Sequence, residues 1–253
     1  MAKDVTQELS KGLRVLHLPT MRSQYEAVAQ QATAQSLAYA EYLLELVEQE
    51  CQQRAHKRVE RLLKASQLPL EKSWAALDLK RLPPKVVQQL RGLLSGDFLD
   101  RRENVLVFGQ PGTGKTHGLC AAAQELVRLG RRLLFTKCEL LVQELLKAKR
   151  DLTLKKCLKQ LAKWEGLIID DLGYVQQSRE EMEVLFTLLA ERYERGSVLV
   201  TSNLPFSKWE QIFKDPMTTA AAIDRLVHHS VIVEVNVPSY RVEAAKKAKQ
   251  AAS

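Results

Sequence analysis

Residues 104–116 read NVLVFGQPGTGKT, and this stretch decides the fold. A short apolar run, NVLVF, enters a glycine-rich turn that ends in Lys115 and Thr116. The order strand, Gly-x-x-x-x-Gly-Lys-Thr, helix is typical of a P-loop, in which glycines let successive backbone amides point at a phosphate. The sequence therefore predicts a nucleotide-binding α/β fold.

The predicted phosphate cradle extends one residue past the motif, and its members are Gly109, Gln110, Pro111, Gly112, Thr113, Gly114, Lys115, Thr116 and His117. We expect Lys115 to reach the β- and γ-phosphates of ATP, and the Thr116 hydroxyl to bind Mg²⁺, which prefers hard oxygen ligands. A glycine-rich turn with a solvated lysine is the competing interpretation, which the flanking strand and helix disfavour.

From Asn104 onward, short apolar runs alternate with longer helical segments. The predicted strands are 105–108, 133–135, 167–170, 198–201 and 231–235, and the predicted helices between them are 115–129, 139–149, 154–163, 180–194 and 209–227, the last interrupted at Pro216. This alternation predicts a five-stranded, mostly parallel sheet with helices on both faces.

The amino-terminal part of the chain has a different character. Residues 25–64 contain no Gly or Pro, and their apolar residues recur at helical spacing. Pro69, Pro83 and Pro84 then punctuate the chain. We therefore predict an all-helical domain over 1–68, a linker over 69–91 and the nucleotide-binding domain over 92–253, with a short basic tail.

Three further positions are candidates for chemistry. The apolar run 167–169 ends in Asp170 and Asp171, whose mutual repulsion a cation would relieve, so we assign Asp170 to Mg²⁺ and Asp171 to polarising the attacking water. Asn203 follows the strand 198–201 and is expected to bind the γ-phosphate or the water, unless it only forms a turn before Pro205. Arg225 ends a helix, where a guanidinium could stabilise phosphoryl transfer in trans, pair with Asp224 or cap its helix.

The chain has 253 residues and a formal charge of +8, from 38 Lys and Arg against 30 Asp and Glu, which suits a polyanionic partner. Basic residues at helical spacing form a stripe of Arg54, Lys57, Arg58, Arg61 and Lys64, which we expect to contact DNA phosphates unless it is a solvated face.

The sequence has no membrane span or signal peptide, so we expect a cytoplasmic protein. The four cysteines lack metal-ligand spacing and are expected to be reduced and mostly in the core, and the five histidines show no ligand pattern.

Nearly the whole chain resembles the IstB-type ATP-binding proteins, AAA+ helpers of insertion-sequence transposition that are related to the helicase loader DnaC. The resemblance rests on ENVLVFGQPGTGKTH, LIIDDLGY, TSNLPFSKWEQIF, AAAIDRLVHHSVIVEV and PSYR, and on LHLPTMRSQYEAVAQQA in the amino-terminal part. It implies that 109–116 are Walker A, Asp170 and Asp171 Walker B, Asn203 sensor 1 and Arg225 the arginine finger. Two departures are Asp171, where AAA+ ATPases commonly have Glu, and the absence of a helical lid after Val235, which leaves Arg241 as a speculative sensor 2.

The resemblance also implies an additional helix that lines a nucleic-acid channel, on which Lys147, Arg150, Lys155 and Lys156 are nominated. The expected function is an ATP- and Mg²⁺-dependent ATPase, slow and stimulated by DNA or a partner. We expect it to form a homo-oligomeric ring or filament on duplex DNA without sequence preference, and to deliver target DNA to a transposase. The alternatives are a replicative helicase loader and a nucleotide-gated DNA scaffold with little hydrolysis.

Overall fold

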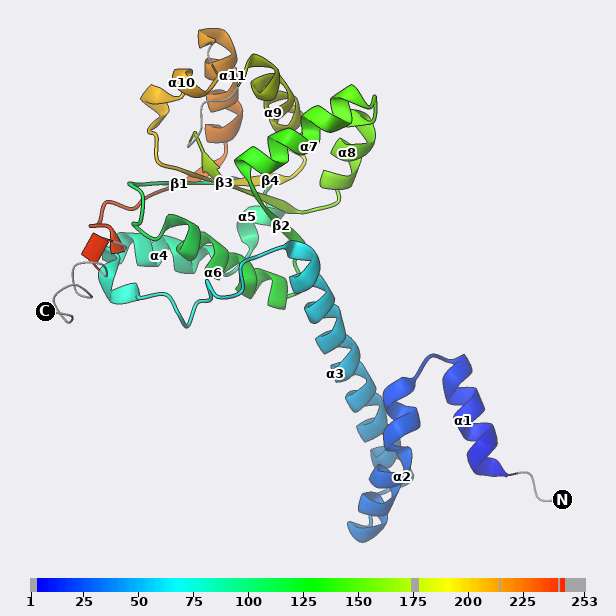
Figure 1. Ribbon diagram of the computed structural model, residues 1–253. Coiled ribbons are helices and arrows are strands. Elements are labelled where there is room, and N and C mark those ends of the chain that lie inside the picture. The colour runs from blue at the N-terminus through cyan, green and yellow to red at the C-terminus, as the bar shows by residue number, and fades with distance from the viewer. Residues whose placement is uncertain (1–3, 174–177, 214, 241, 244–253) are drawn as a thin grey trace, which may run out of the picture. The chain divides into compact units, whose positions relative to one another are not determined.

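The computed structural model describes residues 4–173, 178–213, 215–240 and 242–243 (Figure 1). The chain forms two compact units, Met1–Arg61 and Leu62–Ser253. The helix α3, Tyr39–Ser66, contains the boundary between them.

The first unit is helical, as predicted. It comprises α1 (Val5–Val15), α2 (Pro19–Ala34) and most of α3. The residue before α2 offers no side-chain cap, so Glu50 of α3 takes that role: its Oε2 accepts the backbone N–H groups of Thr20 at 2.8 Å and Met21 at 3.1 Å. A carboxylate at this position satisfies free amides and complements the positive end of the helix. Glu50 therefore ties α2 to α3.

The second unit contains a five-stranded, all-parallel sheet in the order β2-β3-β4-β1-β5. The strands are β1 (Asn104–Phe108), β2 (Leu133–Lys137), β3 (Gly166–Leu172), β4 (Ser197–Ser202) and β5 (Ser230–Glu234). Each contains its predicted run or differs from it by a residue at the ends. Because all strands are parallel, their carboxyl ends meet at one edge of the sheet, where ligands bind in open α/β folds.

Helices cover both faces of this sheet (Figure 1). One face carries α4 (Pro84–Leu93), α5 (Asp97–Asp100) and α6 (Lys115–Arg128), and the other carries α7 (Cys138–Arg150), α8 (Leu154–Leu161), α9 (Arg179–Arg192), α10 (Glu210–Phe213) and α11 (Pro216–Val227). Short 3₁₀ turns lie at Leu79–Arg81 and Phe206–Lys208. Across the described residues, no helix combines the length and the apolar character needed to cross a membrane.

Alternate residues of each strand pack into two hydrophobic cores, one on each face of the sheet. Leu106 of β1 packs on the α7, α9 and α11 side with Ile169, whereas Val105 and Val107 pack on the α4 and α6 side with Ile168. This division explains why the strands read as continuous apolar runs, since both faces are buried. The cysteines agree in part with the prediction of core positions. Cys120 and Cys138 lie in the core, whereas Cys51 is exposed.

The structure differs from the predicted linker over 69–91. This segment belongs to the second unit, where Leu82, Val86 and Leu90 are buried and α4 begins at Pro84. Proline is favoured at the first position of a helix because its missing N–H has no partner there anyway. Pro83 and Pro84 therefore mark the start of a packed helix and not a flexible connection.

Asn104, at the start of β1, joins three elements. Its side-chain Oδ1 accepts the Val198 N–H of β4 at 2.8 Å, and its Nδ2 donates to the carbonyls of Arg225 and Leu226 in α11 at 3.2 and 3.1 Å. Its backbone N–H donates to the His229 carbonyl at 2.7 Å. The amino end of β1 is thereby fixed to the end of α11.

Candidate nucleotide site and nucleic-acid surface

The turn between β1 and α6 has the backbone form that its glycines allow. Gly112 adopts φ +81°, and a Cβ added there would lie 2.1 Å from Ser239 Oγ. A Cβ on Gly109 would lie 2.4 Å from the Val235 carbonyl oxygen. Residues after β5 thus approach the turn closely, and the Tyr240 N–H donates to the Gly112 carbonyl at 2.9 Å. Only glycine fits these two positions without displacing that segment.

A cavity of about 550 Å³ lies beside this turn at the carboxyl edge of the sheet. It brings together five of the residues predicted for chemistry, Lys115, Thr116, Asp170, Asp171 and Asn203. Its other lining residues are Lys72, Pro111, Gly112, Gly114, His117, Lys137 and Tyr240. Of these, Lys72, Lys137 and Tyr240 were not predicted. Lys72 was missed because it lies in the stretch assigned to a linker.

The buried Asp170 carboxylate is the centre of a hydroxyl cluster. Its Oδ1 accepts hydrogen bonds from Thr116 Oγ1 at 2.7 Å and from Thr201 Oγ1 at 2.5 Å. Thr116 and Asp170 were the two predicted Mg²⁺ ligands, and the structure places their oxygens in direct contact. A hydroxyl and a carboxylate are hard oxygen donors, so this pair fits Mg²⁺.

Lys115 is buried and its ammonium points back into the turn. Its Nζ donates to the Gln110 carbonyl at 2.9 Å. The contact holds the ammonium within the predicted phosphate cradle, at the start of α6, where the helix end and free amides attract anions.

Asp171 occupies an irregularity in β3. The pairing of β3 with β4 shifts between Ile169 and Leu172, and Asp171 adopts φ +60°. Its N–H donates to Thr201 Oγ1 at 2.9 Å. A bulge redirects a side chain, here toward the cavity, and Asp tolerates this left-handed conformation better than most residues. The bulge gives a physical reason for an aspartate at this position.

The charge environment of Asp171 suits a proton acceptor. Partial desolvation and then the neighbouring Asp170 raise the pKa of the Asp171 carboxyl, while Lys115, Lys137 and Lys72 oppose the shift. A raised pKa makes this carboxylate a stronger base than a solvated aspartate.

Asn203 lies just beyond β4 and lines the same cavity. Its Oδ1 is one of three buried side-chain atoms without a hydrogen-bond partner among the described residues. Burying an acceptor without a donor is unfavourable. A water or another donor in the cavity would satisfy it, which agrees with a role in positioning water.

A second, smaller pocket of about 240 Å³ adjoins the turn. Its walls are Ala76, Leu77, Asp78, Arg81, Leu82, Thr113, Gly114, His117, Val237, Pro238 and Tyr240. The Arg81 guanidinium lies 5.0 Å from the centre of the Tyr240 ring and pairs with Glu243 at 2.7 Å. Sequence reasoning missed this pocket because most of one wall comes from the assigned linker and another from the segment after β5.

Arg225 lies away from the cradle of its own chain. Its guanidinium sits 4.8 Å from the centre of the Phe186 ring, and its Nη1 donates to the Ala221 carbonyl at 2.9 Å. Arg225 does not line the 550 Å³ cavity. A role for Arg225 in a neighbouring subunit stays a prediction. Arg241 lies outside the described residues.

The amino-terminal basic stripe is exposed along α3, and its member Arg54 forms an ion pair. Arg54 pairs with Glu50 at 2.8 Å and also contacts the His17 carbonyl. Burial raises the pKa of the Glu50 carboxyl, but Arg54 and the two capping N–H groups outweigh it, so the net shift is downward. Arg54 therefore has a structural role that the sequence did not reveal. The other nominated residues of the stripe are Lys57, Arg58, Arg61 and Lys64.

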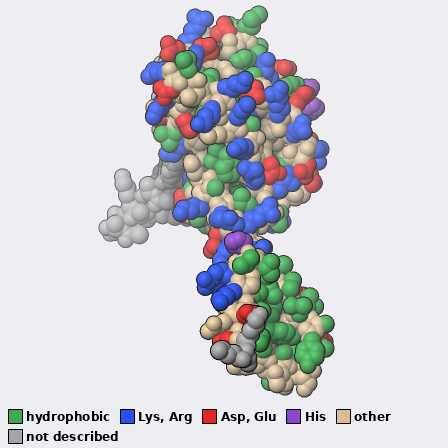
Figure 2. Space-filling view, turned by 90° about the vertical axis from the view of Figure 1, so that its right-hand side faces the viewer, with side chains coloured by type: hydrophobic (Ala, Val, Ile, Leu, Met, Phe, Trp, Pro, Cys, Tyr) green, Lys and Arg blue, Asp and Glu red, His purple; other side chains and the backbone are tan. Residues whose placement is uncertain are grey.

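The second nominated group lies on two consecutive helices. Lys147 and Arg150 end α7, Lys155 and Lys156 begin α8, and all four are exposed. Figure 2 shows many Lys and Arg side chains over the side of the second unit that it displays. Within the described part of the chain, Lys149 is the residue of this region that forms an ion pair, with Glu183 at 3.0 Å.

Solved structures share the architecture of the second unit. A crystal structure of the DnaC helicase loader superimposes with a TM-score of 0.52 at 17% identity, covering 60% of this chain and 88% of that one. The AMPPCP-bound DnaA of Aquifex aeolicus gives 0.57 at 16% identity, covering 73% and 56%. At this identity the likeness establishes the shared fold of the second unit alone.

Sequence relatives are closer. The chain is 41% identical over 239 residues to an insertion sequence ATP-binding protein of Sinorhizobium fredii, covering 94% of this chain and 80% of the relative. It is 36% identical over 244 residues to the insertion sequence IS21 ATP-binding protein of Pseudomonas aeruginosa, covering 95% and 91%. A family model described as IstB-like ATP binding protein matches residues 11–248. With most of its length matched in this way, the chain belongs to the IstB-like ATP-binding protein family.

Proposed function

We propose that this protein is a cytoplasmic, Mg²⁺-dependent ATPase that oligomerises on duplex DNA and delivers target DNA to a transposase. The observation that carries the proposal is the 550 Å³ cavity, in which the phosphate cradle, the Thr116–Asp170 pair and Asp171 meet. Membership of a family whose curated relatives are named insertion sequence ATP-binding proteins supports the link to transposition.

The residues divide the chemistry among them. The 240 Å³ pocket beside the turn would hold the adenine base, and the amides of 109–116 with Lys115 would hold the phosphates. Thr116 and Asp170 would hold Mg²⁺, which supplies charge neutralisation at the phosphates. Asp171 then accepts a proton from the attacking water, and Asn203 orients that water. The short reach of Asp171 is the reason to expect slow turnover, which DNA or a partner would stimulate.

The DNA contacts proposed here are electrostatic. The exposed lysines and arginines of α3, α7 and α8 would neutralise phosphates, and aromatic residues, only 6% of the chain, give little support for stacking on unpaired bases. We propose that Arg225 completes the nucleotide site of a neighbouring subunit, so that bound ATP joins subunits along the duplex. Hydrolysis would then loosen the joint.

Two substitutions test the nucleotide site. Lys115→Ala removes the phosphate-binding ammonium and should abolish binding of a fluorescent ATP analogue. Asp171→Asn keeps a residue that tolerates positive φ, so it should bind ATP and assemble on DNA but lose phosphate release. Lys11→Ala, at an exposed position of α1, is the control and should behave as wild type. Normal turnover by Asp171→Asn would remove Asp171 from the proposed role.

The salt dependence of DNA binding tests the basic surface. Each phosphate contact contributes about 0.9 to the slope of log affinity against log salt. Lys155→Glu should lower that slope by about one contact, whereas Lys11→Glu makes the same charge change at an exposed position of α1 and should leave it nearly unchanged. Equal slopes for the two variants would argue against a contact at α8.

A further inference from the structure

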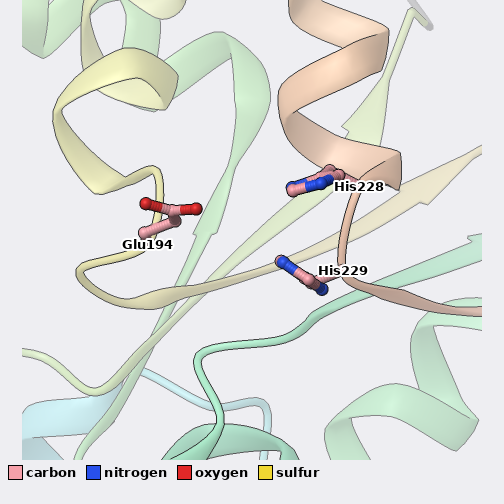
Figure 3. Close-up of side chains that lie close together, drawn as sticks. All are labelled: Glu194, His228 and His229. Carbon is pink, nitrogen blue, oxygen red and sulfur yellow. The ribbon is translucent and has the colours of Figure 1, made fainter.

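A second cluster of potential ligands lies at the end of α11. Glu194, in the turn between α9 and β4, comes together with His228 and His229, and one ligand atom of each lies within 4.8 Å of the others. Figure 3 shows both imidazoles extending toward the Glu194 side. All three side chains are exposed, and none lines the nucleotide cavity.

The chemistry of these three groups selects a class of metal. Two imidazoles and one carboxylate form the ligand set of open zinc sites, in which a fourth position is left to water or another ligand. Mg²⁺ prefers oxygen ligands alone, so it belongs to the Thr116–Asp170 pair. Bond lengths near 2.1 Å require ligand atoms about 3.4 Å apart in a tetrahedral site. The exposed side chains can close the remaining distance by small rotations.

Hydrogen bonds around the cluster orient the ring of His228 and anchor the backbone of His229 and Glu194. The Tyr193 hydroxyl lies 2.9 Å from His228 Nδ1, which leaves the Nε2 of that ring for a metal. The His229 carbonyl accepts the Asn104 N–H at 2.7 Å, and the Glu194 carbonyl accepts from Arg102 Nη1 at 2.6 Å. Metal-binding histidines commonly have such a partner on the second ring nitrogen, and backbone anchoring reduces the cost of ordering the ligands.

The backbone of Glu194 has a conformation found at several helix ends of this chain. It adopts φ +56° just after α9, a conformation and position that glycine usually occupies at helix ends. A glutamate there is less favourable than glycine, but it supplies the carboxylate that faces the histidine pair.

We propose that Glu194, His228 and His229 form a binding site for Zn²⁺ or a similar transition-metal dication. The bound metal would join the α9–β4 turn to the end of α11, three residues after Arg225. The site itself does not depend on the proposed function. Only its consequence, that the metal fixes the helix carrying the proposed intersubunit arginine, rests on it.

Titration calorimetry of the nucleotide-free, full-length protein with zinc chloride tests the site, with Mg²⁺ in the buffer. Wild type should bind one equivalent, and His228→Ala, His229→Ala and Glu194→Gln should each weaken binding at least about tenfold. His56→Ala is the matched control, since His56 pairs with Glu60 at 3.2 Å in α3 and belongs to no three-ligand group among the described residues. It should leave the affinity unchanged. Melting of each variant in EDTA establishes that it is folded.

Cobalt substitution identifies the ligands independently. Co²⁺ bound at this site should show tetrahedral or five-coordinate absorption bands without a thiolate charge-transfer band, and Cys51→Ser should leave the spectrum unchanged. Absence of an equivalent of bound zinc, equal affinity in Glu194→Gln and wild type, or a spectrum that depends on Cys51 would overturn the proposal. Loss of ATPase or DNA binding in other variants would not affect it, because the titration contains neither ligand.

Discussion

Removal of the Thr201 hydroxyl should destabilise the second unit without a change in side-chain volume. Thr201 is completely buried, its Oγ1 donates to the Asp170 carboxylate at 2.5 Å, and the same oxygen accepts the Asp171 N–H at 2.9 Å. Thr201→Val keeps the shape and removes both interactions. The residue therefore links the buried carboxylate to the bulge that presents Asp171.

The size of the effect follows from the two bonds. Loss of a hydrogen bond to a charged group costs about 1.5 to 3 kcal/mol, and a buried N–H left without an acceptor costs about 1 to 3 kcal/mol. Taking values near the lower end of both ranges gives about 3 kcal/mol. For a unit of this size, that corresponds to a fall in Tm of roughly 6 to 12 °C.

Thr201→Ser is the matched control because it keeps the hydroxyl and loses one methyl group, at a cost of about 0.8 kcal/mol. Tryptophan fluorescence during thermal melting is the appropriate assay, since Trp74, Trp164 and Trp209 all belong to the second unit. Without nucleotide, the Thr201→Val variant should have a much lower melting temperature than the Thr201→Ser variant. Equal melting temperatures for the two variants would refute the inferred hydrogen bonds.

Three other substitutions have defined outcomes. Gly112→Ala places a Cβ 2.1 Å from Ser239 Oγ at φ +81° and should lower stability by about 1 to 3 kcal/mol in urea denaturation, whereas Gly92→Ala, with open space around it, should stabilise α4 slightly. Arg192→Met removes the guanidinium that donates to the carbonyls of Leu161, Trp164, Glu165 and Ser197, of which Leu161 and Glu165 keep a backbone donor. It should cost about 2 to 5 kcal/mol by the same assay, and a loss below about 1 kcal/mol would contradict this account. Glu50 has a lowered pKa in the folded state, so its contribution is present above the ordinary value of 4.5 and is lost as pH falls through the lower folded value. Circular dichroism melts at falling pH should show this loss in wild type and not in Glu50→Gln, and identical pH profiles would exclude it.

The sheet and the phosphate turn could be predicted because their signals are local. The apolar run NVLVF indicates a strand, and the glycines at 109, 112 and 114 indicate a phosphate-binding turn. The acids that end β3 indicate a cation site. Lys115, Thr116, Asp170, Asp171 and Asn203 line one cavity because parallel strands end at one edge of the sheet.

The features that were missed depend on tertiary contacts. Leu82, Val86, Leu90 and Leu93 have helical spacing, but the prolines at 83 and 84 favoured a linker although they start α4. The bulge at Asp171 follows from its bond to Thr201 on the next strand, and the engagement of Arg54 follows from a carboxylate needed at the start of α2. The spacing of residues along the sequence does not predict these two contacts.

Through the bonds of Asn104, β1 connects the end of α11 to the phosphate turn at Gly109. At its amino end, the Asn104 amide holds the last carbonyls of α11, and at its carboxyl end Phe108 continues directly into Gly109. A strand of this length spans about 16 Å. Because β1 is buried on both faces and pairs with β4 on one side and β5 on the other, it holds the phosphate turn and the end of α11 at a fixed separation.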